Sequence, residues 1–525
     1  MLNPTLARII PLSLLQYFEY FILNNYDRSK KFLNRINPEF LEEISRKKAL
    51  KIFKIAAKET PAYQKFLAKN KLNPKQIRSL ADFDNLLPET DKANYIKKYS
   101  FEERCREGHL PKEGNIDESG GTSGKATNWV HAFQEEDLLF KAINFSFNYV
   151  FEGNKKDFLV ISAWSVGPWA TGIKFSEMME RISLVKNTAT DPNDIIETLK
   201  IFGNKRNYLI AGYPPFVKNL IEEHPEVGWK RYNIDLVTGG EGVPIEWVYY
   251  MKRKLKEGAK IVSSFGCSDV DIGIGTETSF CFFIRELAYK NEKLRQELFG
   301  KEELPMVFQY NPLTHYIHPT KSPEGKEEFA ITLLDSHAAV PKVKYNLHDE
   351  GKKLRFQEMI DTLTKYEPHF LKKFSASGYG KAEDIINLPF LCIFGRSDGT
   401  LSFDGANVFP DQIEGGILNN AKLEKITHRF KMERHFDHKH DVEFRVHVEL
   451  KQGIKLDNKL KPKYQSSILK EILKLNPDYC ESYSHNQKII PIIYLYSFDH
   501  PLFKQDDRKV KNIYFMKNKN PGKKH

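Results

Sequence analysis

The loop between residues 119 and 127 carries the residues best suited to anion chemistry. It combines three glycines, four hydroxyl side chains and one lysine, in the order Ser119-Gly120-Gly121-Thr122-Ser123-Gly124-Lys125-Ala126-Thr127. Glycines let backbone N–H groups turn towards a bound anion without Cβ clashes. Hydroxyl groups can donate hydrogen bonds to phosphate oxygens, and Lys125 adds a mobile positive charge. The composition predicts a polyphosphate site, although a hinge between two segments would have a similar composition.

This loop differs from the common phosphate-binding loop. That loop has a glycine five positions before the glycine of its Gly-Lys pair and a Ser or Thr directly after the lysine. Here Ser119 and Ala126 occupy those positions. The loop instead resembles the Ser-Gly-(Thr/Gly)-Thr-(Thr/Ser)-Gly-Lys-Pro signature of the adenylate-forming superfamily, with Ala126 in place of the proline. That superfamily contains acyl-CoA ligases, adenylation domains of peptide synthetases and firefly luciferase.

Two polar turns follow predicted strands further along the chain. They are Thr238-Gly239-Gly240-Glu241-Gly242 and Phe265-Gly266-Cys267-Ser268-Asp269. Ligands of parallel sheets bind beyond the carboxyl ends of the strands, so we expect both turns, including Gly240 and Glu241, to approach a nucleotide. The second turn resembles the superfamily motif aromatic-Gly-x-Thr-Glu. This resemblance implies that Phe265 stacks on adenine, Ser268 contacts the α-phosphate and Asp269 holds Mg²⁺.

A later stretch resembles the segment in which a superfamily aspartate binds both ribose hydroxyls. It reads Val340-Pro341-Lys342-Val343-Lys344-Tyr345-Asn346-Leu347-His348-Asp349-Glu350-Gly351. The resemblance gives that role to Asp349, and a carboxylate that accepts from two vicinal hydroxyls is a sound ribose anchor. The superfamily has Thr-Gly where this chain has Leu347-His348, so only the carboxylate is carried over.

The longest match lies between Phe394 and Glu414. It contains Gly395-Arg396-Ser397-Asp398 and, further on, Gly405 and Pro410-Asp411-Gln412-Ile413-Glu414. This order is similar to the superfamily's hinge motif. The resemblance implies that Arg396 contacts the ribose or a phosphate and that Asp398 is the hinge of a small carboxyl-terminal domain. It also implies that Gly405 faces the active site during a second half-reaction.

Two further sets of site residues are less specific. The superfamily places a catalytic lysine near its carboxyl terminus, and Lys511 is our choice over Lys509. The resemblance therefore makes Lys511, Lys125 and Ser268 the catalytic residues. We expect the pocket for the acid near Trp164, Trp169 and Tyr213, because aromatic walls suit a flat apolar acid. These aromatic residues have an equally good interpretation as core residues.

The predicted secondary structure supports an α/β fold around these motifs. Apolar runs at 158–161, 208–211, 234–237 and 260–265 predict strands, and Asp191-Pro192 predicts the start of a helix between two of them. The alternation favours a mixed, largely parallel sheet with covering helices. We expect an ATP- and carboxylate-binding domain over 1–397, mainly helical over 1–110. A smaller, mobile α+β lid domain would span 398–525.

The composition sets further limits on the chain. Its 525 residues have a formal net charge of +11, but no run of Lys and Arg with interleaved aromatics stands out, so we expect no nucleic-acid partner. The five cysteines are scattered, which favours a reducing compartment, the cytoplasm, and no zinc site. The His-rich stretch 435–441 could be mistaken for a metal site. It lies between strand-like runs, so we expect a solvated hairpin turn.

The segment Ile9 to Leu23 is rich in apolar and aromatic residues, but Gln16 and Glu19 interrupt it. It is too polar to span a membrane, and it lacks the small-residue cleavage site of a signal peptide. We expect an amphipathic helix. Packing on the body of the protein is the favoured interpretation, with peripheral contact with a membrane or partner as the alternative.

Together the motifs resemble most closely the phenylacetate–CoA ligase-like branch of the superfamily. The resemblance implies an enzyme that uses ATP and Mg²⁺ to convert a small-molecule carboxylate to acyl-AMP and pyrophosphate, and then transfers the acyl group to coenzyme A. One alternative is transfer to a protein thiol, an amine or a sugar, as in capsule synthesis. Another is a non-catalytic ATP-binding relative, which the departures at Ala126, Ser268 and Asp269 motivate.

Overall fold

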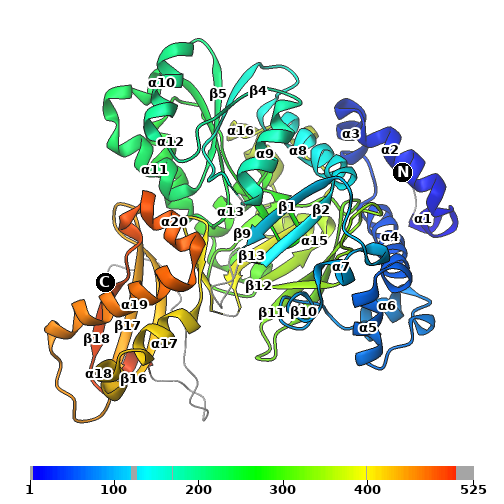
Figure 1. The fold of residues 1–525 in the computed structure, drawn as a ribbon. Coiled ribbons are helices and arrows are strands. Elements are labelled where there is room, and N and C mark those ends of the chain that lie inside the picture. The colour runs from blue at the N-terminus through cyan, green and yellow to red at the C-terminus, as the bar shows by residue number, and fades with distance from the viewer. Residues whose placement is uncertain (1–3, 120–126, 168, 398, 504–525) are drawn as a thin grey trace.

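The computed structural model describes residues 4–119, 127–167, 169–397 and 399–503. Within them the chain forms a large α/β body and a smaller α+β part, which is coloured yellow to red at the lower left of Figure 1. The predicted fold class is therefore confirmed.

An eleven-stranded sheet forms the centre of the α/β body, in the order β10-β11-β12-β13-β9-β8-β7-β6-β5-β3-β4. Strands β4, β3, β5, β6 and β7 pair in parallel, as the alternation up to residue 265 predicts. The other strand pairs are antiparallel, and short connections such as 268–270 between β7 and β8 permit no other pairing. The bounds are β3 (Phe158–Ser162), β4 (Leu184–Asn187), β5 (Asn207–Gly212), β6 (Asn233–Thr238), β7 (Ile261–Cys267), β8 (Asp271–Thr276), β9 (Met306–Gln309), β10 (His315–Lys321), β11 (Glu327–Leu333), β12 (Tyr345–Leu354) and β13 (Phe390–Arg396).

Helices cover both faces of the parallel half, which explains why every side chain of β3 is buried. One face packs against α10 (Pro192–Phe202), α11 (Pro214–Glu223) and α12 (Ile245–Lys254), and the other against α8 (Glu136–Phe151) and α9 (Ala170–Glu180). Helix α10 begins as predicted, because the Asp191 side chain accepts a hydrogen bond from the Asn193 N–H and Pro192 is the first helical residue.

The antiparallel half is also covered on both faces. Helices α4 (Pro38–Glu59), α5 (Pro61–Lys69) and α6 (Leu80–Leu86) pack on one face. The other face carries α13 (Ser279–Lys290), α14 (Glu292–Phe299), α15 (Phe356–Tyr366) and α16 (Phe370–Ala376). Helix α4 ends at Glu59, because Thr60 precedes Pro61 and the residue before a proline disfavours the helical conformation.

Three amino-terminal helices lie at the right-hand edge of the body in Figure 1, on the side away from the α+β part. They are α1 (Pro4–Ile9), α2 (Leu12–Leu23) and α3 (Tyr26–Leu33). Leu15, Glu19 and Ile22 of α2 are buried against the body, which fits the favoured packing interpretation. Among the described residues, no helix is long and apolar enough to cross a membrane.

The α+β part builds a hydrophobic core from its own elements, with members between Phe403 and Ile493. Its three-stranded sheet pairs β16 with β17 antiparallel and β17 with β18 in parallel. Stretch 437–441 forms the turn between β16 and β17, where Asp437 accepts from two backbone N–H groups, so the predicted hairpin turn is confirmed. The bounds are β14 (Leu401–Phe403), β15 (Ala406–Val408), α17 (Pro410–Leu418), α18 (Ala421–Ile426), β16 (Thr427–Phe436), β17 (Val442–Leu450), α19 (Lys461–Leu475), α20 (Pro477–His485) and β18 (Ile492–Tyr496).

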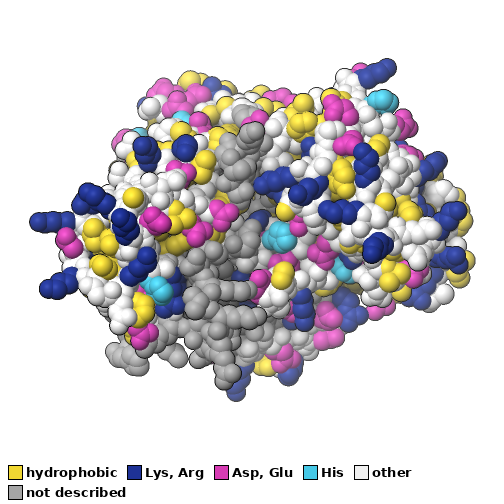
Figure 2. Space-filling view, turned by 60° about the horizontal axis from the view of Figure 1, so that its bottom comes forward, with side chains coloured by type: hydrophobic (Ala, Val, Ile, Leu, Met, Phe, Trp, Pro, Cys, Tyr) yellow, Lys and Arg dark blue, Asp and Glu magenta, His cyan; other side chains and the backbone are white. Residues whose placement is uncertain are grey.

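Charged side chains are spread over the surface. On the face drawn in Figure 2, basic side chains are scattered among acidic ones on both sides of the molecule. The net charge of +11 therefore does not gather into a single patch on this face.

Neighbouring glycines of α17 give a matched test of the packing between α17 and α19. A Cβ on Gly416 would lie 2.6 Å from Ile468 Cα, whereas a Cβ on Gly415 would meet only the flexible Glu471 side chain at 3.4 Å. We expect Gly416→Ala to lower the free energy of unfolding by about 1–3 kcal/mol, because backbone must shift. Gly415→Ala should be neutral or stabilising by up to about 1 kcal/mol, because alanine favours helix. Thermal melting of both variants checks this, and equal melting temperatures would contradict it.

Candidate functional site

A cleft of about 1680 Å³ opens where the sheet of the α/β body meets the α+β part. Its walls come from the ends of β6, β7, β12 and β13 and from the β14–β15 turn. Residues 118–119, which lead into the 119–127 loop, also line it. Residues from each of the predicted motifs therefore meet at one place, although they are far apart in the sequence. The lining includes Ser119, Gly240, Glu241, Phe265, Gly266, Ser268, Asp269, Asp349, Arg396 and Gly405.

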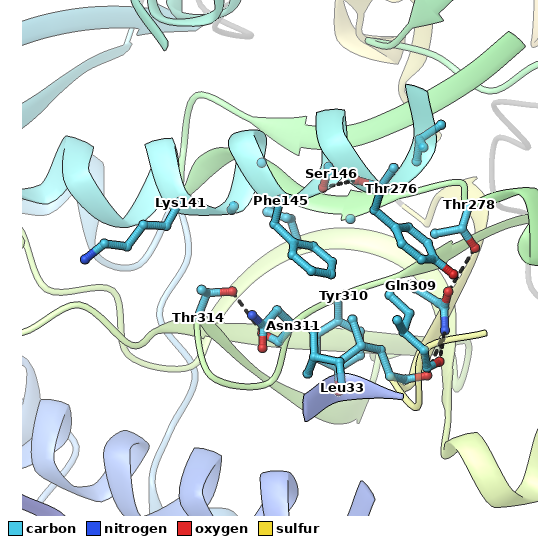
Figure 3. A pocket seen from close by; sticks show the side chains of 18 of the residues that line it. Leu33, Lys141, Phe145, Ser146, Thr276, Thr278, Gln309, Tyr310, Asn311 and Thr314 are labelled. Atoms are coloured by element: carbon cyan, nitrogen blue, oxygen red, sulfur yellow. Dashed lines mark hydrogen bonds between the residues drawn. The ribbon is translucent and has the colours of Figure 1, made fainter. Parts of the chain in front are cut away.

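A second cavity lies beneath α8 and is shown in Figure 3. Its volume is about 50 Å³, and the rings of Phe145 and Tyr310 lie across it. Polar groups at its end satisfy one another, since the Thr278 hydroxyl donates to Gln309 Oε1 and the Gln309 amide donates to the Ile386 carbonyl. This cavity has room for a water molecule but not for a nucleotide, so the larger cleft is the candidate site.

The phosphate loop is carried by an antiparallel hairpin of β1 (Gly114–Ser119) and β2 (Thr127–Ala132), in which Ser119 pairs with Thr127. The Ser119 hydroxyl accepts hydrogen bonds from Lys92 Nζ at 3.0 Å and from Trp129 Nε1 at 2.8 Å. The other predicted phosphate contacts, Gly120, Gly121, Thr122, Ser123, Gly124 and Lys125, lie outside the described residues. The structure thus fixes where the loop leaves and rejoins the body.

A buried polar cluster anchors this hairpin to α8 and α9. Lys174 Nζ lies 2.8 Å from Asp117 Oδ2 and 3.1 Å from Glu136 Oε1. Burial opposes the charge on Lys174, but Glu136 and Asp117 outweigh it and raise the pKa of the lysine. His131 sits between Asp117 and Glu135, and burial lowers its pKa to about 3, so the ring is neutral. The Lys174 cation therefore links Asp117 of the β1–β2 hairpin to Glu136 of α8.

The end of β7 and the β7–β8 turn bring together the residues predicted to bind adenine and Mg²⁺. Phe265 packs against Phe308, with ring centroids 5.7 Å apart. Gly266 has no room for a side chain, because a Cβ would lie 2.2 Å from the Ile272 carbonyl oxygen. Asp269 accepts a hydrogen bond from the Tyr345 hydroxyl at 2.8 Å. The turn can therefore present both a ring face and a carboxylate to the cleft.

Lys92 connects the two phosphate-side motifs. Its Nζ lies 3.3 Å from Asp269 Oδ1 as well as 3.0 Å from the Ser119 hydroxyl. The sequence gives no signal for this role of Lys92, because no spacing rule links residues so far apart in the chain. Its position makes it a cation that can meet a phosphate at the junction of the two motifs.

The predicted ribose residues are cross-strand neighbours. Asp349 on β12 pairs in register with Arg396 on β13, and Arg396 Nη1 lies 3.7 Å from Asp349 Oδ1. His348 has a φ of +61°, in the region that favours glycine. This explains why the superfamily has glycine in a position that histidine occupies here. His348 also contacts Asp91 at 3.4 Å and Glu328 at 3.5 Å, and sequence reasoning gave it no role.

The α+β part closes the cleft at the Gly240–Glu241 turn. Ser402 Oγ donates to the Gly240 carbonyl at 3.2 Å, and Arg434 Nη2 lies 2.7 Å from Glu241 Oε1. Burial raises the pKa of Glu241 to about 7, while Arg434 opposes the shift. A Cβ on Gly405 would lie 2.2 Å from Tyr213 Cε1, so only glycine allows this approach. Gly405, predicted to face the site, therefore contacts one of the proposed acid-pocket residues.

The three aromatic residues assigned to the acid pocket occupy different positions. Tyr213 and Trp169 line the cleft, and Trp169 lies beside Glu118 at the phosphate-loop hairpin. Trp164 is buried and packs edge-on against Tyr213, with centroids 5.0 Å apart. It supports the wall instead of lining it. The predicted hinge Asp398 and the predicted lysines Lys509 and Lys511 lie outside the described residues.

Comparisons with known proteins agree with this architecture. A phenylacetate–coenzyme A ligase from Aromatoleum evansii is 22% identical to this chain over 378 residues, which cover 70% of this chain and 73% of that protein. A solved structure of 2-hydroxyisobutyryl-CoA ligase, in complex with 2-HIB-AMP and CoA in the thioesterification state, matches with a TM-score of 0.61 at 12% identity and covers 90% of this chain and 89% of that chain. No family model matches the chain.

Two other states of the same ligase also match. An open conformation with 2-HIB-AMP and CoA gives a TM-score of 0.52 at 12% identity, covering 91% of this chain and 92% of that chain. The postadenylation state with R3-HIB-AMP gives 0.51 at 13% identity, covering 90% and 89%. This chain shares the fold of these ligase structures, and the resemblance predicted from its motifs is confirmed.

The buried cation below the phosphate loop gives a stability prediction. We expect Lys174→Met to lower the free energy of unfolding by about 3 kcal/mol at pH 8, because Asp117 and Glu136 would stay buried without a cation. The loss should be smaller at pH 5, where the orphaned carboxyl groups, with raised pKa values, take up protons. Denaturant unfolding at both pH values measures it.

Lys200→Met is the matched control, because Lys200 forms a surface ion pair with Glu197. This variant should melt like the parent at both pH values. An equal loss of stability for Lys174→Met at pH 5 and pH 8 would point to lost packing and contradict the charge argument.

Proposed function

We propose that the protein is an ATP-dependent carboxylate–CoA ligase that forms acyl-AMP and then an acyl thioester. The observation that carries the proposal is the convergence of the motif segments on one cleft, from Ser119 through Asp269 and Asp349 to Gly405. The similarity to a phenylacetate–coenzyme A ligase supports the reaction class. The proposed substrates are therefore ATP, a small carboxylic acid and coenzyme A.

In the first half-reaction, a carboxylate oxygen of the acid attacks the α-phosphorus of ATP, and pyrophosphate leaves. Phe265 would stack on adenine, and Asp349 would accept hydrogen bonds from the ribose hydroxyls, with Arg396 beside it. The phosphate loop, Ser268 and Lys92 would meet the phosphate oxygens. Catalysis of this type depends mainly on positioning and on neutralising charge.

Asp269 fits the proposed Mg²⁺ site. It lines the cleft near Ser119, and Mg²⁺ needs only one or two carboxylates when phosphates supply other ligands. Bound there, the ion would neutralise phosphate charge. Without it, the Tyr345 hydroxyl and Lys92 hold the carboxylate in position.

In the second half-reaction, the sulfur of coenzyme A attacks the acyl carbonyl carbon and AMP leaves. The TM-score of 0.61 with the thioesterification state, against 0.51 and 0.52 with two other states of that ligase, supports an arrangement suited to this step. The contact of Gly405 with Tyr213 supports it independently. We propose that the lid domain, 398–525, turns about Asp398 and brings Lys511 to the cleft for the first half-reaction.

The function is tested by ATP–pyrophosphate exchange with Mg²⁺ and a panel of aryl, fatty and amino acids. We expect exchange that depends on one class of acid, and AMP release with thioester formation when coenzyme A is added. If pyrophosphate exchange occurs but product formation does not depend on coenzyme A, the acyl acceptor would be a protein thiol, an amine or a sugar. ATP binding without exchange for every acid, or no ATP binding, would overturn the proposal.

Gly405 gives a test that separates the two half-reactions. In Gly405→Ala the new Cβ would overlap Tyr213, and relieving such an overlap costs about 1–3 kcal/mol. We expect thioester formation from acyl-AMP to fall about 10- to 100-fold, while pyrophosphate exchange stays close to that of the parent.

Gly453→Ala is the control, because Gly453 has a similar φ of +83° but nothing within 4 Å of a Cβ. It should leave both half-reactions unchanged. An equal loss of both half-reactions in Gly405→Ala would contradict a role confined to the closed arrangement.

A further inference from the structure

Helices α1 and α2 expose a row of large apolar side chains. Tyr17 is 76% exposed and Ile9 is 72% exposed, and on α2 the positions 14, 17, 18 and 21 follow one helical stripe. We call this surface the amino-terminal apolar face. Its members are Leu6, Ile9, Leu14, Tyr17, Phe18, Tyr20 and Phe21.

The polar residues of α2 point the other way, into the body. Glu19 is only 9% exposed and forms an ion pair with the buried Lys48 at 2.7 Å, and Lys48 also donates to the Leu313 carbonyl. Gln16 accepts a hydrogen bond from Lys51 at 3.0 Å. A surface helix of a globular protein normally turns its apolar stripe inward. Here the inward side combines Leu15 and Ile22 with the charged Glu19, and the outward stripe contains the aromatics.

The amino-terminal apolar face has a basic rim. The Arg28 guanidinium lies 3.9 Å from the centre of the Phe21 ring, and Lys31 and Arg35 are exposed at and just after the end of α3. Arg8 on α1 is also exposed and forms an ion pair with Glu43 at 2.8 Å. Residues 4–33 contain two acids, of which Glu19 is buried and paired with Lys48. Residues 4–35 contain five basic residues against these two acids, so the net charge of this segment is positive.

We propose that the amino-terminal apolar face docks on an anionic phospholipid bilayer, with α1 and α2 lying in the plane of the interface. Tyrosine and phenylalanine beside arginine and lysine are the composition that interfacial helices use. The 12 residues of α2 extend only about 18 Å, too short to cross about 30 Å of hydrocarbon.

Charge argues against a second copy of this chain as the occupant. A two-fold contact between identical faces would bring the same surface patch of both copies together, so the basic rims would repel each other. An anionic lipid surface has the complementary charge. The face lies at the edge of the body away from the α+β part (Figure 1), so this inference does not rest on the proposed reaction.

The test is co-sedimentation of the full chain with vesicles of phosphatidylcholine alone and of phosphatidylcholine mixed with phosphatidylglycerol. We expect binding to the mixed vesicles that weakens as salt is raised. The double variant Tyr17→Ser/Phe21→Ser should bind about tenfold more weakly or worse, because two aromatic side chains no longer leave water. Its melting temperature should match that of the parent, because both side chains are exposed.

The matched control is Leu184→Ser/Ile201→Ser. These two apolar residues are 59% and 74% exposed but lie on β4 and α10. This variant should bind vesicles like the parent. The proposal is overturned if the parent binds neither vesicle, or if both double variants bind alike. It is also overturned if sedimentation shows a parent dimer that Tyr17→Ser/Phe21→Ser abolishes, since the face would then join two copies.

Discussion

The contact between the β14–β15 turn and the Gly240 turn is the constraint on which the form of the cleft depends. Gly405 reaches Tyr213 so closely that no Cβ fits, and a Cβ on Gly240 would also meet Tyr213, at 3.1 Å. The two glycines therefore act together, one on each side of the cleft. Neither hydrophobic core extends across this contact, because the core of the α+β part consists of its own residues. The Arg434–Glu241 ion pair lies beside it, and burial raises the pKa of Glu241 to about 7.

Cations hold the phosphate side of the cleft in place. Lys174 fixes the base of the β1–β2 hairpin from below, and Lys92 joins Ser119 to Asp269 from the side. A polyphosphate carries several negative charges, and a site that already positions cations needs little rearrangement to accept it. The same cations also pair with Asp269 and Asp117, which are both buried. The stability of the β1–β2 hairpin and the affinity for a polyphosphate would therefore depend on the same charges.

The sequence predicted elements where local signals were strong. The apolar run at 158–161 and the Asp191-Pro192 helix start have local physical causes, and the structure contains both. The nucleotide-site residues were predicted from motifs that resemble those of the superfamily, and the described ones line the cleft, whereas Trp164 lies behind its wall. Lys92, His348 and Arg434 were missed because their roles come from contacts between distant segments. The left-handed backbone at His348 was not predicted either, although the resembled motif has glycine at this position.

The amino-terminal helices show a further limit of pattern reasoning. The spacing of apolar residues in α2 predicts a helix with two faces, but it does not say which face turns inward. That choice depends on Lys48 and Lys51 of α4, which offer partners to Glu19 and Gln16. A buried ion pair seldom stabilises a fold more than apolar packing would. Folding alone therefore does not explain why the aromatic stripe of α2 is exposed. Docking on the proposed lipid surface would remove these side chains from water, which is favourable.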